Sequence, residues 1–132
     1  MTIWFLDASV LLASEDPDDE NCADANRLLL SSEPLATLDL AFYEVTNVAL
    51  RAWNDEPAAR RLRERVAAIG EDGGLLRASV DPLAGAAAVA GTHGISVYVA
   101  AARTANAELV SCDRRDLVSR GLARLPGSAL IA

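Results

Sequence analysis

The sequence predicts an α/β fold, a three-layer sandwich in which a small parallel sheet of four or five strands is flanked by helices. Short apolar segments of strand length alternate along the chain with longer amphipathic segments of helical period. No Asn-Gly turn joins two of the apolar segments, and strands that are connected through helices run parallel. The 132 residues contain no repeat, linker or low-complexity tract, so we expect residues 1–132 to form a single domain.

The expected strands are short apolar runs, and two of them lead to a carboxylate. In chain order these strands cover residues 3–7, 35–38, 75–80, 108–112 and 129–131. After the first strand, a turn at Ser9 leads into a short apolar segment over residues 10–14. The third strand follows the turn-forming pair Gly73-Gly74 and is expected at an edge of the sheet.

The expected helices carry their own start and stop signals. In chain order they cover residues 21–30, 40–53, 57–69, 81–93, 97–106 and 115–121. The acids of residues 16–20 suit the positive end of the first helix dipole, and Asp39 can cap the second helix. Pro57 suits the first turn of the third helix, which Gly70 ends.

The charged residues exclude several classes of protein. The net charge is −7, and all 12 basic residues are arginines, so chemistry that needs a lysine is excluded, including Schiff bases, P-loops and receiver domains. The apolar runs are far shorter than the ~20 residues that span a bilayer, and no basic region precedes the first of them. We therefore expect a cytoplasmic protein that does not enter a membrane.

Acidic side chains gather where ligands of parallel sheets bind, beyond the carboxyl ends of the strands. Asp7 ends one expected strand, Asp113 follows another, and Asp116 lies one turn further on. Glu44 interrupts an otherwise apolar helical stretch. Such acids cannot all ionise in one cleft without a counter-charge, and in the absence of lysine the natural one is Mg²⁺ or Mn²⁺.

A metal held by carboxylates activates water and neutralises charge on a phosphoryl group, as in many nucleases. The same acids also have a simpler reading that stays open. In that reading Asp7 caps a turn, Glu44 is solvated on a helix face, and Asp113 begins a loop. A phosphatase of the haloacid dehalogenase type is excluded, because it needs Asp-x-Asp where this chain has Asp7-Ala8-Ser9.

Four segments in order give the chain a family resemblance. They are Asp7-Ala8-Ser9, residues 44–51 (EVTNVALR), residues 98–103 (YVAAAR) and residues 109–113 (LVSCD). The chain resembles a PIN domain, and within that family a VapC-type ribonuclease toxin of a bacterial toxin–antitoxin pair. The resemblance implies a small parallel sheet flanked by helices, and a Mg²⁺- or Mn²⁺-dependent endoribonuclease. It implies that Asp7, Glu44 and Asp113 are catalytic and metal-binding, that Asp116 is a further metal ligand, and that Ser9 is a supporting hydroxyl.

The chain departs from the family pattern at one position. Family members usually carry another metal-binding Asp at the start of the helix before the last acidic strand, and here Ile95 takes its place in the alignment. No carboxylate occurs between Asp81 and Glu108, as if four residues were missing beside Tyr98. Either the segment is deleted in the protein, which would weaken metal binding, or the protein has residues that this sequence lacks. A catalytically inactive PIN-like protein-binding module is therefore the alternative function.

Expected partners follow partly from charge and partly from the resemblance. Arg114 and Arg115 flank Asp113 and are candidates for contact with RNA phosphates. Apolar surface on the helices at residues 21–30 and 40–53 predicts a homodimer and a groove for a peptide or helix. The resemblance identifies the expected occupant of that groove as a cognate antitoxin with an arginine-bearing segment.

Overall fold

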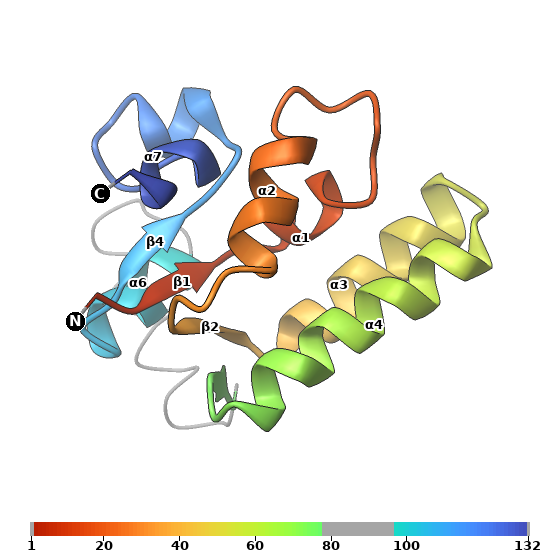
Figure 1. The fold of residues 1–132 in the computed structure, drawn as a ribbon, viewed down its shortest axis with the longest axis horizontal. Helices are drawn as coiled ribbons and strands as arrows, with labels where there is room; N and C mark the ends of the chain where they lie inside the picture. Colours follow the sequence, from red (N-terminus) through yellow and green to blue (C-terminus); the bar gives the residue numbers. More distant parts are fainter. Residues whose placement is uncertain (1, 78–96, 132) are drawn as a thin grey trace.

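A four-stranded parallel sheet forms the centre of the computed structural model, which describes residues 2–77 and 97–131 (Figure 1). The strands are β1 (Trp4–Leu6), β2 (Leu35–Leu38), β3 (Leu75–Leu76) and β4 (Glu108–Val110). Their order in the sheet is β3-β2-β1-β4, so β1 lies between β2 and β4. In the register of this sheet Phe5 lies opposite Ala36 on one side and Leu109 on the other. The α/β fold with a parallel sheet is confirmed.

Helices cover both faces of this sheet, as predicted (Figure 1). They are α1 (Ala8–Ala13), α2 (Cys22–Leu29), α3 (Leu40–Asn47), η1 (Val48–Ala52), α4 (Glu56–Glu71), α6 (Val97–Thr104), η2 (Arg114–Val118) and α7 (Pro126–Leu130). The expected helix over residues 40–53 is thus α3 continued by a π-helical turn, η1. Helices α3 and α4 lie side by side as a long pair that extends away from the sheet (Figure 1).

The central strand shows why three layers form. All three residues of β1 are buried, which requires cover on both faces. Because side chains alternate along a strand, Trp4 and Leu6 pack into one core with α1, α2, α3 and α4, whereas Phe5 packs into the other with α6 and η2. Buried Thr37 donates a hydrogen bond from Oγ1 to the Leu6 carbonyl at 2.8 Å and ties β2 to β1.

One expected strand is wrong. Residues 129–131 belong largely to α7, which begins at Pro126 after the extended residue Leu125. A run of three apolar residues does not distinguish a strand from a helix, and Pro126 in the first turn favours the helix. The expected cap Asp39 lies at the N-cap position of α3, but its side chain makes no capping hydrogen bond.

Two other predicted elements lie partly or wholly outside the described residues. Strand β3 covers the start of the predicted run 75–80, and the helix expected over residues 81–93 lies outside the described residues, as does Ile95. In the part of the chain that is described, no helix is long and apolar enough to cross a membrane.

Candidate functional site

The candidate site begins where β1 ends. Asp7 follows β1 directly and caps α1, accepting a hydrogen bond from the backbone N–H of Ser9 at 3.0 Å. Its own N–H donates to the Val110 carbonyl at 3.2 Å, which holds it beside the end of β4. The Asp7 side chain is buried, and this burial raises the pKa of its carboxyl, against hydrogen bonds from Ser111 and Ser9 that lower it. The site therefore contains an acid whose charged form is costly.

Two serine hydroxyls connect the ends of β1 and β4. Ser9 Oγ donates to Asp7 Oδ1 and accepts a hydrogen bond from the Cys112 N–H at 2.9 Å. Ser9 Oγ also lies 3.2 Å from Ser111 Oγ, which accepts a hydrogen bond from the Asp113 N–H at 3.0 Å. An unbroken series of hydrogen bonds therefore runs from the Asp7 carboxylate to the backbone of Asp113.

Glu44, on α3, lies near enough to Asp7 for the charge of Asp7 to act on its carboxyl. Its carboxylate is half-buried, and Tyr98 Oη of α6 donates a hydrogen bond to Oε2 at 3.3 Å. Burial raises the pKa of Glu44, the Tyr98 hydrogen bond lowers it, and the charge of Asp7 raises it further. Each of the two carboxylates thus lies in a place that disfavours its negative charge.

The other two predicted acids lie further from this pair. Asp113 is partly exposed at the N-cap of η2, where its Oδ1 accepts a hydrogen bond from the Asp116 N–H at 3.0 Å. Asp116 itself is exposed. Across residues 2–77 and 97–131, no three Asp, Glu, His or Cys side chains come together closely enough to hold a metal ion. The structure therefore places Glu44 within reach of the charge of Asp7, and joins Asp113 to Asp7 through the serines.

The donor chemistry of this pair fits a hard divalent cation. Carboxylate and hydroxyl oxygens are the ligands that Mg²⁺ prefers, and Mg²⁺ often binds through one or two carboxylates while keeping several waters. Within the described residues, no arginine forms an ion pair with Asp7, Glu44 or Asp113. The two carboxylates thus lack a counter-charge from this part of the protein.

The two arginines expected at RNA differ in their surroundings. Arg114 Nε forms an ion pair with Glu20 Oε1 at 2.9 Å. Arg115 is exposed and makes no ion pair with any other described residue. Both lie in η2 directly after Asp113.

Sequence reasoning missed two side chains of this site. Ser111 is fully buried and supports Asp113, and its signal was a lone polar residue two positions before Asp113 in an apolar strand. Tyr98 contributes a hydroxyl to Glu44, although its place on an apolar helix face is typical of a core aromatic.

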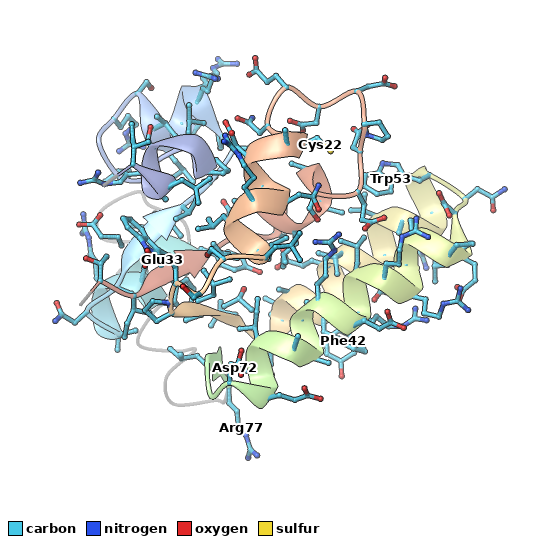
Figure 2. All side chains as sticks on the ribbon, in the orientation of Figure 1. Cys22, Glu33, Phe42, Trp53, Asp72 and Arg77 are labelled. Atoms are coloured by element: carbon cyan, nitrogen blue, oxygen red, sulfur yellow. The ribbon has the colours of Figure 1, made fainter. Side chains whose placement is uncertain are left out.

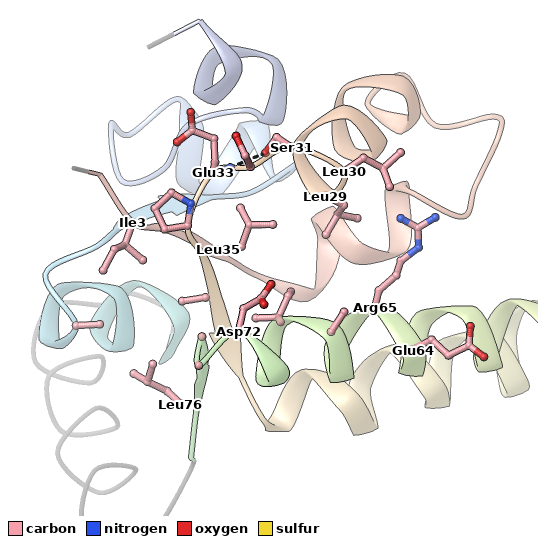
Figure 3. Close-up of a pocket in the computed structure, with 18 of the residues that line it drawn as sticks. Ile3, Leu29, Leu30, Ser31, Glu33, Leu35, Glu64, Arg65, Asp72 and Leu76 are labelled. Carbon is pink, nitrogen blue, oxygen red and sulfur yellow. Dashed lines mark hydrogen bonds between the residues drawn. The ribbon is translucent and has the colours of Figure 1, made fainter.

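A separate hollow lies at the opposite edge of the sheet, where β1 and β2 begin (Figure 3). Its volume is about 780 Å³, and its walls come mainly from the end of α2, the loop before β2 and the last turns of α4. Leu29, Leu30 and Leu35 give it apolar walls, with Arg65 and Asp72 at its side (Figure 3). Figure 2 shows Trp53 at the far end of the α3–α4 pair, away from this hollow.

Solved structures of other proteins share this fold over nearly the whole chain. Neither a scan of protein-family models nor a search of curated proteins finds a match. Among solved structures, PAE2754 from Pyrobaculum aerophilum is 25% identical with a TM-score of 0.68, covering 98% of this chain and 88% of that one. A toxin–antitoxin complex from Klebsiella pneumoniae is 16% identical with a TM-score of 0.63, covering 92% and 96%. VapBC2 from Rickettsia felis, bound to a DNA fragment from its promoter, is 11% identical with a TM-score of 0.58, covering 94% and 97%.

Proposed function

We propose that this chain, which has the PIN-like fold of these structures, is a VapC-type toxin that hydrolyses RNA phosphodiester bonds with Mg²⁺ or Mn²⁺. The fold that the sequence resemblance implied is the fold that the structure has. Two of the similar structures are toxin–antitoxin assemblies, which supports the biological role. The observation that carries the chemistry is the pair of desolvated carboxylates, Asp7 and Glu44, at the carboxyl edge of the sheet.

The pair explains why a divalent cation would bind. Each carboxylate is held where burial raises its pKa, and the charge of Asp7 opposes that of Glu44. A cation between them would offset both effects, because an opposite charge within a few ångströms favours the ionised acid. Asp7 and Glu44 would hold it, with Asp113 and Asp116 on the side of β4. When bound, the cation supplies charge neutralisation at the phosphoryl group and an activated water.

Residues around the pair would orient it and attract the substrate. Ser9 fixes Asp7 Oδ1 and so sets the direction of that carboxylate. Arg115 would contact the phosphate backbone of RNA, because it is exposed beside the acidic edge. Arg114 would do so after exchanging Glu20 for a phosphate, which an exposed ion pair permits at little cost.

Cleavage of RNA tests this proposal. The wild-type chain should cut RNA in Mg²⁺ and stop when EDTA is added, and Asp7→Asn should cut at least ~100-fold more slowly, because a ligand to the cation is lost. Asp72→Asn is the matched control, since Asp72 is exposed at the opposite edge of the sheet. Mg²⁺-dependent cleavage that is equal in Asp7→Asn and Asp72→Asn would overturn the assignment.

The antitoxin and a second copy of the chain are proposed partners. The hollow beside α2 and α4 is the candidate place for an antitoxin segment, since Leu30 is 82% exposed at its margin and charged residues flank its apolar walls. Leu40 and Leu50 are exposed along α3 and η1, which supports a homodimer through this face. Replacing Leu30 with a charged residue should weaken antitoxin binding without changing the dimer. Replacing Leu50 with a charged residue should weaken the dimer without changing antitoxin binding.

One observation favours a second candidate function, an inactive PIN-like module that binds a protein partner. Asp7 and Glu44 are joined by no third carboxylate in the described residues, whereas a nuclease site gains affinity from each added ligand. A module of this kind would bind no Mn²⁺ through Asp7 and would still bind the antitoxin. Calorimetric titration with Mn²⁺ distinguishes the two functions.

A further inference from the structure

Tyr98 lies where α6 meets the acidic pair. It belongs to the first turn of α6, and its ring packs edge-on against Phe5, with ring centroids 6.4 Å apart and an angle of 65° between the planes. Phe5 is fully buried in β1, two residues before Asp7. The Tyr98 ring is therefore held against the sheet, and its hydroxyl reaches Glu44 Oε2 at 3.3 Å.

The hydroxyl of Tyr98 can act only as a donor to this carboxylate. A phenol ionises at about pH 10, so it carries its proton at neutral pH. A phenol donates one hydrogen bond, and in this structure Glu44 Oε2 accepts it.

We propose that Tyr98 is a positioning residue, whose hydroxyl holds the Glu44 carboxylate in one orientation at the candidate site. Glu44 extends from α3 on a side chain with three rotatable bonds and is only half-buried, so packing alone leaves it free to turn toward solvent. The hydrogen bond from the Tyr98 hydroxyl restrains the Glu44 side chain against this motion. The functional consequence rests on the proposed cation site, whereas the orientation of Glu44 does not depend on it.

A purely structural role for Tyr98 predicts a different outcome. If the ring served only to pack against Phe5, then Tyr98→Phe would leave the orientation of Glu44 and its metal affinity unchanged, because the edge-on ring contact remains. If the hydroxyl positions Glu44, the same substitution frees the carboxylate while leaving the fold intact. Partners that orient a metal ligand typically change metal affinity about 10- to 100-fold when they are removed.

The experiment compares Tyr98→Phe with Tyr43→Phe. Tyr43 precedes Glu44 on α3, is 69% exposed, and packs on Phe42. Tyr43→Phe therefore also removes a phenol hydroxyl, but from a residue that is only a neighbour of Glu44 in the chain and gives it no hydrogen bond. The first measurement is made by NMR on the metal-free protein. It records the chemical shift of the Glu44 carboxyl carbon and the scalar couplings along the Glu44 side chain. Tyr98→Phe should shift the signal and average the couplings, and Tyr43→Phe should leave both unchanged. An unchanged Glu44 signal in Tyr98→Phe overturns the proposal.

The second measurement is the affinity for Mn²⁺, by calorimetry. Tyr98→Phe should weaken binding about tenfold or more, and should have no further effect in a Glu44→Gln background. Mn²⁺ binding that is measurable in the wild type and equally tight in Tyr98→Phe overturns the proposal even if the NMR signal moves. If the wild type binds no Mn²⁺ while the Glu44 signal still responds to Tyr98→Phe, positioning by Tyr98 is supported and the cation site of the proposed function fails.

Discussion

The hydroxyl oxygens of Ser9 and Ser111 lie 3.2 Å apart, across the carboxyl ends of the neighbouring strands β1 and β4. Ser9 binds the Asp7 carboxylate, and Ser111 binds the backbone N–H of Asp113. The pair therefore sets the distance between two acids that stand 106 positions apart in the chain, as Asp7 and Asp113 do. The strand ends place Asp7 and Asp113 at the same edge of the sheet. The two serines then fix the position of Asp113 relative to Asp7.

Ser111→Ala should lower the free energy of unfolding by about 1–2 kcal/mol, because it removes the partner of the Asp113 N–H and the partly buried contact with Ser9. Ser32→Ala is the control, since Ser32 is exposed in the loop before β2. Urea unfolding at neutral pH measures both. An equal effect of the two substitutions would mean that the hydroxyl pair contributes nothing to stability.

Asp7→Asn should stabilise the metal-free protein at neutral pH. Burial raises the pKa of Asp7 in the folded state above its ordinary value of 3.8, so between those two pH values the folded state binds more protons than the unfolded state. Stability then falls as the pH rises through this window, and the loss is complete above the folded pKa. Asparagine carries no charge and escapes that loss, so its advantage should be largest at pH 7 and should shrink as the pH falls toward 3.8. Thermal unfolding from pH 4 to 8 in EDTA checks this, and an advantage for Asp7→Asn that grows on acidification would contradict it.

Glu15→Gln should destabilise the protein through the loop that joins α1 to α2. The Glu15 side chain is only 8% exposed, and its carboxylate pairs with Arg65 at 3.1 Å and with Arg61 at 2.7 Å on α4. Gln keeps one acceptor oxygen but loses the charge, so we expect a measurable drop in the free energy of unfolding. Glu56→Gln is the matched control, because Glu56 is 62% exposed and lies 3.4 Å from Arg63. Chemical denaturation should show a clearly larger loss for Glu15→Gln, and a loss no larger than that of the control would refute the role of this pair.

Local pattern was enough to predict most of the sheet. The apolar run at residues 35–38 coincides with β2, and the runs that lead to Asp7 and Asp113 contain β1 and β4. Burial on both faces makes such strands apolar throughout, which is a strong signal even over three or four residues. The run at 129–131 gave the same signal and is wrong, because the chain reaches it through Pro126 in the first turn of α7.

The candidate site was predictable in its residue types and only partly in its geometry. Asp7 and Asp113 follow strands, so their edge of the sheet could be inferred, and the buried surroundings of Glu44 were visible as an acid in an apolar helix. The contacts between Ser9 and Ser111 and between Tyr98 and Glu44 join residues far apart in the chain, and local sequence pattern does not predict such pairs. The metal-binding roles of the four acids stay predictions.

The proposed function depends most on one property, that Asp7 and Glu44 together bind a divalent cation. Titration of the metal-free chain with Mn²⁺, followed by calorimetry, measures it directly. We expect saturable binding by the wild type and by Asp72→Asn, and at least a tenfold loss of affinity in both Asp7→Asn and Glu44→Gln, because each removes one of few ligands. No binding by the wild type, or binding that both substitutions leave unchanged, would contradict the account.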